Sequence, residues 1–149
     1  MHARRLSTTA SLVALLVMSL VLPVSGCGQL GVDELDGTRW LLVGWSAETD
    51  GPERFIVTLA FEDGQAVGQA PVNSYGGEYA TTRAGGFAVG QIAQTLMAGP
   101  PEAMEAESTY FELLRAASEY RIDDGRLVLS SEEESELLVF VEELRYTSP

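Results

Sequence analysis

The sequence predicts a mainly β fold, namely a small antiparallel, barrel-like domain of about eight strands with one amphipathic α-helix. Two observations predict this class. Apolar residues alternate with a period of two in short runs that are separated by Gly-containing turns, and one segment, 101–118, has a helical period instead. A closed or nearly closed barrel suits so many short strands, because closure removes exposed strand edges.

The predicted strands begin at residue 39. The first run is 39–45, and in the second, 54–61, every other residue is a large apolar one. Asp63-Gly64 then forms a two-residue turn that leads into a strand at 65–70, which is the clearest hairpin in the chain. A loop is predicted at 71–77, and further strands at 78–82, 86–92, 119–122, 126–130 and 136–142.

The predicted helix begins at Pro101, a residue suited to a first helical position. Met104, Phe111, Leu114 and Ser118 follow at helical spacing. Three glutamates, Glu102, Glu105 and Glu107, lie near its N-terminus, where the helix dipole favours negative charge. We expect this helix to pack on the sheet or to close one end of the barrel.

The first 26 residues have the three parts of a secretory signal peptide: a basic start, an apolar run at 10–22 and a stretch of small residues. The run is shorter than the roughly 20 residues that a membrane-spanning helix needs. We therefore predict a signal peptide at 1–26, a tether at 27–36 and a folded domain at 37–145.

The signal ends in Val24-Ser25-Gly26-Cys27. This resembles the lipobox of bacterial lipoproteins, in which the Cys thiol carries a diacylglyceryl group and becomes the mature N-terminus. The resemblance implies a lipid anchor at Cys27, on the outer face of the cytoplasmic membrane or on the outer membrane, since two or more acyl chains hold a protein firmly. The alternative is an ordinary signal peptide with a free thiol.

The charge balance excludes one class of partner. The chain has 22 Asp and Glu against 9 Arg and no Lys, a formal net charge of −13. Removal of residues 1–26 takes away Arg4 and Arg5 and leaves −15. Nucleic acid is not expected as a partner, because its phosphates require clustered basic residues.

The composition also excludes most catalytic chemistry. The single His, His2, and the single Cys, Cys27, both lie in the first 27 residues. The remaining domain therefore lacks the residues for Ser-His-Asp, Cys-His and Schiff-base catalysis, and for His- or Cys-ligated zinc. The acidic stretches 123–124 and 132–136 lack the spacing of a calcium loop and are interpreted as solvated turns. No cofactor or metal is expected.

The segment Asn73-Ser74-Tyr75-Gly76-Gly77 contains the only Asn of the chain. It is either a structural turn, since Asn and Gly tolerate positive φ, or a recognition loop. Glu107 could pair with an Arg, cap backbone groups near Asn73 or remain solvated. Trp40 and Trp45 are expected in the core, with the lining of a ligand cavity as the alternative.

Several short motifs follow one another between residues 37 and 142. They are Gly37-Thr38-Arg39-Trp40, the segment 68–79 with Asn73, Tyr75, Gly77 and Tyr79, the segment 95–99 with Thr95 and Met97, Glu107 followed by Tyr110-Phe111, and the closing strands 126–129 and 137–140. Their order resembles the META domain, the HslJ-like family of bacterial envelope proteins. The resemblance implies a small barrel-like β fold with one helix, an envelope association linked to heat or antibiotic stress, and no established catalytic activity.

Three positions depart from the family pattern. The two family cysteines correspond to Val72 and Gly99 here, and an Arg that is common in the family is Leu96. Loss of both cysteines together leaves no unpaired thiol. No role that depends on that pair or on that Arg can be transferred to this chain.

The sequence thus favours a non-enzymatic, monomeric, lipid-anchored envelope domain that binds a protein or another envelope component under stress. Two alternatives stay open. One is a carrier that holds a small apolar ligand in the mouth of the barrel, and a packed interior would argue against it. The other is a hydrolase that uses two carboxylates, although nothing in the sequence singles out such a pair.

Overall fold

The computed structural model describes residues 33–48 and 51–143. The predicted signal peptide, the predicted lipidation site Cys27 and the first part of the predicted tether lie outside the described residues. The elements, in chain order, are β1 Arg39–Trp45, the short 3₁₀ turn η1 Pro52–Arg54, β2 Thr58–Glu62, β3 Gln65–Gln69, β4 Ser74–Thr81, β5 Phe87–Val89, β6 Ala93–Gln94, α1 Pro101–Ala116, β7 Glu119–Asp123, β8 Arg126–Ser130 and β9 Leu138–Glu142.

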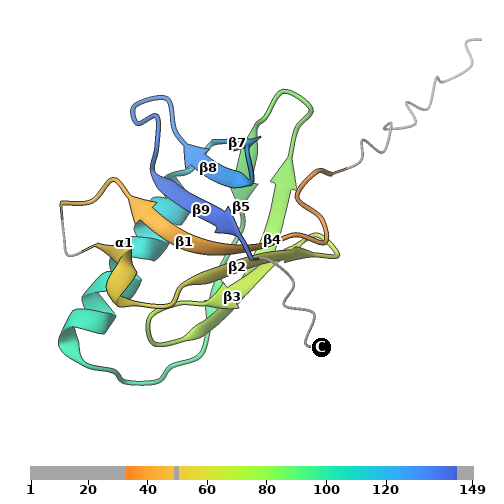
Figure 1. Ribbon diagram of the computed structural model, residues 1–149. Helices are drawn as coiled ribbons and strands as arrows, with labels where there is room; N and C mark the ends of the chain where they lie inside the picture. Colours follow the sequence, from red (N-terminus) through yellow and green to blue (C-terminus); the bar gives the residue numbers. More distant parts are fainter. Residues whose placement is uncertain (1–32, 49–50, 144–149) are drawn as a thin grey trace, which may run out of the picture. The chain divides into compact units, whose positions relative to one another are not determined.

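The strands form one antiparallel sheet in the order β5-β4-β3-β2-β1-β9-β8-β7 (Figure 1). The short strand β6 pairs with the first part of β4. The two ends of this order meet, because the N–H of Phe87 donates to the C=O of Ser118 (2.9 Å) and the N–H of Tyr120 donates to the C=O of Gly85 (2.8 Å). The sheet is therefore a nearly closed barrel. The predicted mainly β class with a single helix is confirmed.

Two Asp-Gly pairs make the tight turns of the barrel. Asp63 and Gly64 have φ of 50° and 76°, and Asp124 and Gly125 have φ of 46° and 72°. Positive φ at both central residues is the requirement of a type I′ turn, which Asp-Gly satisfies at low steric cost. The hairpins β2–β3 and β7–β8 thus lie where the sequence predicts them.

Several predicted bounds are wrong. The predicted loop 71–77 is short, since Ser74–Gly77 already belongs to β4 and pairs with β3. The predicted strand 86–92 contains only β5, and the unpredicted β6 follows it. The second strand begins at Thr58 instead of residue 54, because η1 occupies residues 52–54, and the last begins at Leu138 instead of 136. Met104 is 46% exposed and lies off the buried face of α1. That face contains the predicted Phe111 and Leu114, together with Ala103, Ala106, Glu107 and Tyr110.

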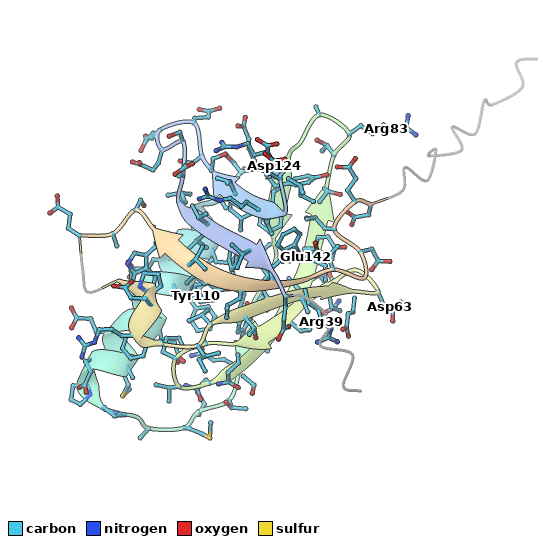
Figure 2. All side chains as sticks on the ribbon, in the orientation of Figure 1. Arg39, Asp63, Arg83, Tyr110, Asp124 and Glu142 are labelled. Atoms are coloured by element: carbon cyan, nitrogen blue, oxygen red, sulfur yellow. The ribbon has the colours of Figure 1, made fainter. Side chains whose placement is uncertain are left out.

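The two ends of β3 mark two ends of the barrel, which we call the turn end and the helix end. At the turn end, next to the Asp63-Gly64 turn, the N–H of Gly37 donates to the C=O of Phe61 (2.7 Å) and Leu35 is fully buried. Residues 33–36, predicted as tether, are thus part of the folded domain. At the helix end, near Gln69 and Ser74, lies α1. Figure 2 labels Asp63 at the turn end and Tyr110 beside α1.

Side chains fill the interior of the barrel. Trp40, Phe61, Tyr110 and Phe140 are almost completely buried and belong to one continuous apolar cluster with residues from α1 and from most strands. Trp40 is a core residue, as expected, and Trp45 packs against the same cluster. A small barrel either is filled by side chains or holds a ligand, so this packing argues against the apolar-ligand carrier.

Candidate functional site

The carboxylate of Glu107 lies inside the domain at the helix end of the barrel. Its Oε2 accepts hydrogen bonds from the backbone N–H groups of Val72 (2.9 Å) and Asn73 (2.7 Å), and its Oε1 accepts one from the side-chain amide of Asn73 (2.7 Å). These three donors offset the cost of burying the carboxylate. Of the arrangements left open by the sequence, Glu107 adopts the one in which it caps backbone groups near Asn73.

Asn73 also bonds a third segment of the chain, residues 95–97. Its Oδ1 accepts hydrogen bonds from the hydroxyl of Thr95 (2.8 Å) and from the N–H of Met97 (2.8 Å). The N–H of Thr95 also donates to the C=O of Ser74 (3.0 Å). We call Asn73 and Glu107 the clamp, because together they tie α1, the start of β4 and the segment 95–97 to one another.

The structure brings four of the seven predicted site residues together in and around the clamp: Asn73, Thr95, Met97 and Glu107. Tyr75 lies two residues after Asn73, in β4, where its hydroxyl donates to the C=O of Thr58 (2.9 Å) and contacts the hydroxyl of Tyr110 (2.5 Å). Burial raises the pKa of both tyrosines well above the ordinary value.

The other two predicted site residues lie apart from the clamp. A Cβ at Gly77 would stand 2.9 Å from the C=O oxygen of Gln91, so glycine there permits the close approach of the chain before β6. Tyr79 packs edge to face on Phe61, with the ring centroids 4.7 Å apart. Burial, and then the carboxylates of Asp33 and Asp36, raise the pKa of Tyr79.

Two stretches of the chain without charged residues adjoin the clamp, and the sequence motifs did not reveal them. Residues 64–77 and 84–101 contain no charged residue, although the chain as a whole carries 22 acids and 9 Arg. The two stretches are adjacent in the fold, because β6 pairs with the start of β4 through Tyr75↔Gln94 and Gly76↔Ala93, and β4 pairs with β3. A plot of charge along the chain would have revealed both stretches.

Large apolar side chains protrude from the segment that the clamp holds. Leu96 is 92% exposed and Met97 is 55% exposed, whereas the N–H of Met97 is bound by Asn73. The clamp therefore fixes the backbone while the side chains remain accessible. We call residues 95–98 the presented segment.

The positions of the two family cysteines are in contact. A Cβ built on Gly99 would lie 3.5 Å from the Cβ of Val72 and 2.7 Å from its Cγ2. The first distance is within the range of disulfide-bonded cysteines, and the second shows that the Val72 side chain occupies the space of the missing bridge. Van der Waals contact between these two positions, together with the clamp, holds the segments 72–73 and 95–99 to each other.

This geometry predicts that the double substitution Val72→Cys and Gly99→Cys, in a chain with Cys27→Ser, forms a disulfide on oxidation. Closing a loop of this length should raise the free energy of unfolding by about 3.5 kcal/mol. Urea unfolding with and without reductant measures the gain, and the matched Val72→Ser/Gly99→Ser variant shows none. Two thiols that stay reactive after oxidation would contradict the prediction.

The other acidic residues that the structure describes form no comparable buried site. Glu119, Arg121 and the turn Glu132–Glu134 line a hollow of about 430 Å³ that is open to solvent, and its carboxylates are exposed. Among residues 33–48 and 51–143, no cluster of three or more acidic, His or Cys side chains is arranged to hold a metal ion. The described part of the chain also contains no helix that is both long and apolar enough to cross a bilayer.

Comparison with known proteins gives a family and a fold. The family model described as META domain matches residues 33–144. The NMR structure of a protein from Burkholderia xenovorans is 22% identical and has a TM-score of 0.58, with 74% of this chain and 85% of that one covered. The crystal structure of a DUF4847 family protein from Bacteroides vulgatus is 14% identical, with a TM-score of 0.55 and coverages of 72% and 94%. No curated protein matches the chain.

Proposed function

The chain belongs to the META domain family, and we propose that it acts as a non-catalytic, lipid-anchored module of the bacterial cell envelope that binds a protein partner through the presented segment. The observation that carries this proposal is the clamp. Two buried polar residues hold an exposed apolar segment in one conformation. A segment that is ordered before binding loses less conformational entropy when a partner binds.

The chemistry of the clamp supports a binding role over a catalytic one. Both carboxylate oxygens of Glu107 are occupied by donors from Val72 and Asn73. Glu107 is also the only buried acidic side chain among the described residues, so no second buried carboxylate faces it. A hydrolase with two carboxylates needs both groups on either side of a substrate bond, and this arrangement offers no such pair.

The position of the predicted lipid anchor supports the proposed binding function. Cys27 precedes Asp33 by six residues, and six residues span at most about 20 Å. Residues 33–38 contact the turn end of the barrel, whereas the presented segment is bound to Asn73 and Ser74 at the helix end. An anchor at Cys27 would keep the turn end near the membrane and leave the presented segment accessible to another envelope protein.

The test is photo-crosslinking in living cells with the full-length chain. A crosslinking amino acid at Leu96 should capture one protein at high yield, with the yield compared between stressed and unstressed cells. The control places the same amino acid at Ile56, an apolar side chain that is 75% exposed and lies before β2. Metabolic labelling with a palmitate analogue tests the anchor, and Cys27→Ala should abolish both the label and the crosslink.

Two results would contradict the proposal. Equal capture at Leu96 and Ile56 would show that no specific partner occupies the presented segment. Failure of Cys27 to incorporate the lipid analogue in a bacterial host with lipoprotein processing would show that the protein has no lipid anchor at this residue. The variant Asn73→Ala gives a further check: it should lower the yield at Leu96 by about tenfold, because the backbone at Met97 loses its hydrogen bond to Asn73.

A further inference from the structure

The outer edge of β6 is a strand edge without a partner among the described residues. β6 pairs with β4 on one side, and no other strand pairs with it. The backbone N–H and C=O groups of Ala93 and Thr95 point toward β4, since the N–H of Thr95 donates to the C=O of Ser74 and Ala93 lies opposite Gly76. Gln94 lies between them in a pair without hydrogen bonds, so its N–H and C=O point away from the sheet. These outward groups can bind a further strand.

Apart from the shortness of β6, which has two residues, this edge carries no charged residue and no proline. Proteins protect exposed edges by keeping them short and by placing charged residues, proline or bulges on them. β7, which ends the sheet order and meets the chain beside β5, carries the charged residues Glu119, Arg121 and Asp123. By contrast, the chain from Gly90 to Gly99 has neither charge nor proline, and its residues from Ala93 to Ala98 are exposed.

The surroundings of the edge indicate what kind of segment fits it. A shallow hollow of about 280 Å³ lies beside the edge and is lined by Ser74, Tyr75, Ala93, Gln94 and Thr95. Leu96, which follows the lining residue Thr95 in the chain, is almost fully exposed. Backbone groups supply the affinity of strand addition and such hollows receive alternate side chains. An uncharged segment with small apolar side chains at alternate positions matches this surface.

We propose that the partner docks by adding one extended, uncharged segment as a strand along Gln94–Leu96. This inference rests on the proposed function and names the chemistry of the partner: a neutral polypeptide strand in place of a helix, a lipid or a charged motif. A second copy of this chain fits less well, because two domains with a large net negative charge repel each other.

The decisive variant is Gln94→Pro. Proline removes the outward N–H of residue 94 and places its ring on the outer edge, while the inward hydrogen bond of Thr95 to Ser74 is left in place. Leu96→Lys adds a charge at the edge, as natural protected edges do. Ile56→Lys is the matched control, since it replaces another exposed apolar side chain by the same residue.

The experiment selects binders from random ten-residue peptides displayed on phage, with the purified lipidated protein in detergent as the target. Enriched peptides should be uncharged with alternating apolar residues, and they should slow hydrogen exchange at the amides of Gln94 and Leu96. Gln94→Pro and Leu96→Lys should each weaken their binding at least about fivefold, in keeping with the loss of one hydrogen bond or of edge access. Ile56→Lys should leave it unchanged.

Other outcomes would overturn the inference. No enrichment, enrichment of charged or helical peptides, or equal binding to the Gln94→Pro variant would each exclude strand addition at this edge. Concentration-dependent dimerisation that Gln94→Pro abolishes would identify a second copy as the occupant. If crosslinking at Leu96 succeeds while the peptide selection fails, the partner-binding function stands and strand addition alone is wrong.

Discussion

Replacing Glu107 by alanine is expected to lower the free energy of unfolding by about 4 kcal/mol, because three donors lose their acceptor at once. The backbone N–H groups of Val72 and Asn73 and the side-chain amide of Asn73 all bond this carboxylate. Asn73 is itself buried, so water replaces the lost bonds poorly. Urea unfolding followed by tryptophan fluorescence measures the change as a lower midpoint with an unchanged slope.

Two companion variants separate the clamp from general effects on the helix. Glu105→Ala removes an exposed carboxylate two residues earlier in α1 and should change stability by less than about 0.5 kcal/mol. Glu107→Gln keeps the shape but presents an NH₂ group to donors that need an acceptor, so it should still lose about 2 kcal/mol. A loss below about 1 kcal/mol for Glu107→Ala would show that the clamp contributes little to the fold.

The parts of this fold that could be predicted from sequence are those with a local cause. The Asp63-Gly64 and Asp124-Gly125 turns need positive φ at both positions, and alternation around them locates β2, β3, β7 and β8. The helix was recognisable by its spacing, yet Met104 was placed on the wrong face. Ala103 and Ala106 are small and carry a weak apolar signal, although both are buried.

The parts that could not be predicted depend on long-range pairing. β6 has only two residues, Ala93 and Gln94, and neither has a preference that marks a strand. These two residues form a strand because they pair with Gly76 and Tyr75 of β4. Glu107 and Asn73 are 34 residues apart, so their contact is invisible to local patterns. Asn73 was singled out as the only Asn of the chain, but its role as a link between three segments follows only from the fold.

Two buried tyrosines are expected to make the protein unusually sensitive to alkali. Burial raises the pKa of Tyr75 and of Tyr110, whereas a tyrosine in the unfolded chain ionises near pH 10. Stability from these groups is therefore fully present below about pH 10 and is lost as the pH rises toward their folded pKa values. Each group lowers the free energy of unfolding by about 1.4 kcal/mol per pH unit in that window, so the pair removes about 3 kcal/mol by about pH 11.

The composition makes this effect easy to measure. The chain has no Lys, so its five tyrosines are the main groups that titrate above pH 10. The number of phenolate groups follows from absorbance near 295 nm, and unfolding in urea at each pH gives the stability. The buried pair should ionise only together with unfolding.

Tyr110→Phe gives the sharpest form of this prediction, because its effect should change sign with pH. The hydroxyl of Tyr75 donates to the C=O of Thr58, so its oxygen accepts the proton of Tyr110. At pH 8 the variant loses that one hydrogen bond and should be less stable by about 1 kcal/mol. It also lacks one of the buried hydroxyls whose ionisation favours the unfolded chain, so near pH 12 it should be the more stable protein by about 1 kcal/mol or more.

The crossing of the two stability curves distinguishes ionisation from simple packing. A variant that only lost packing would stay less stable at every pH, and its curve would run parallel to that of the original protein. Tyr75→Phe supplies the comparison: it removes the acceptor of Tyr110 and the donor to Thr58 together, so at pH 8 it should cost more than Tyr110→Phe, about 2 kcal/mol. Above pH 10 it should show the same reduced slope, because it too leaves only one of the two buried hydroxyls to ionise.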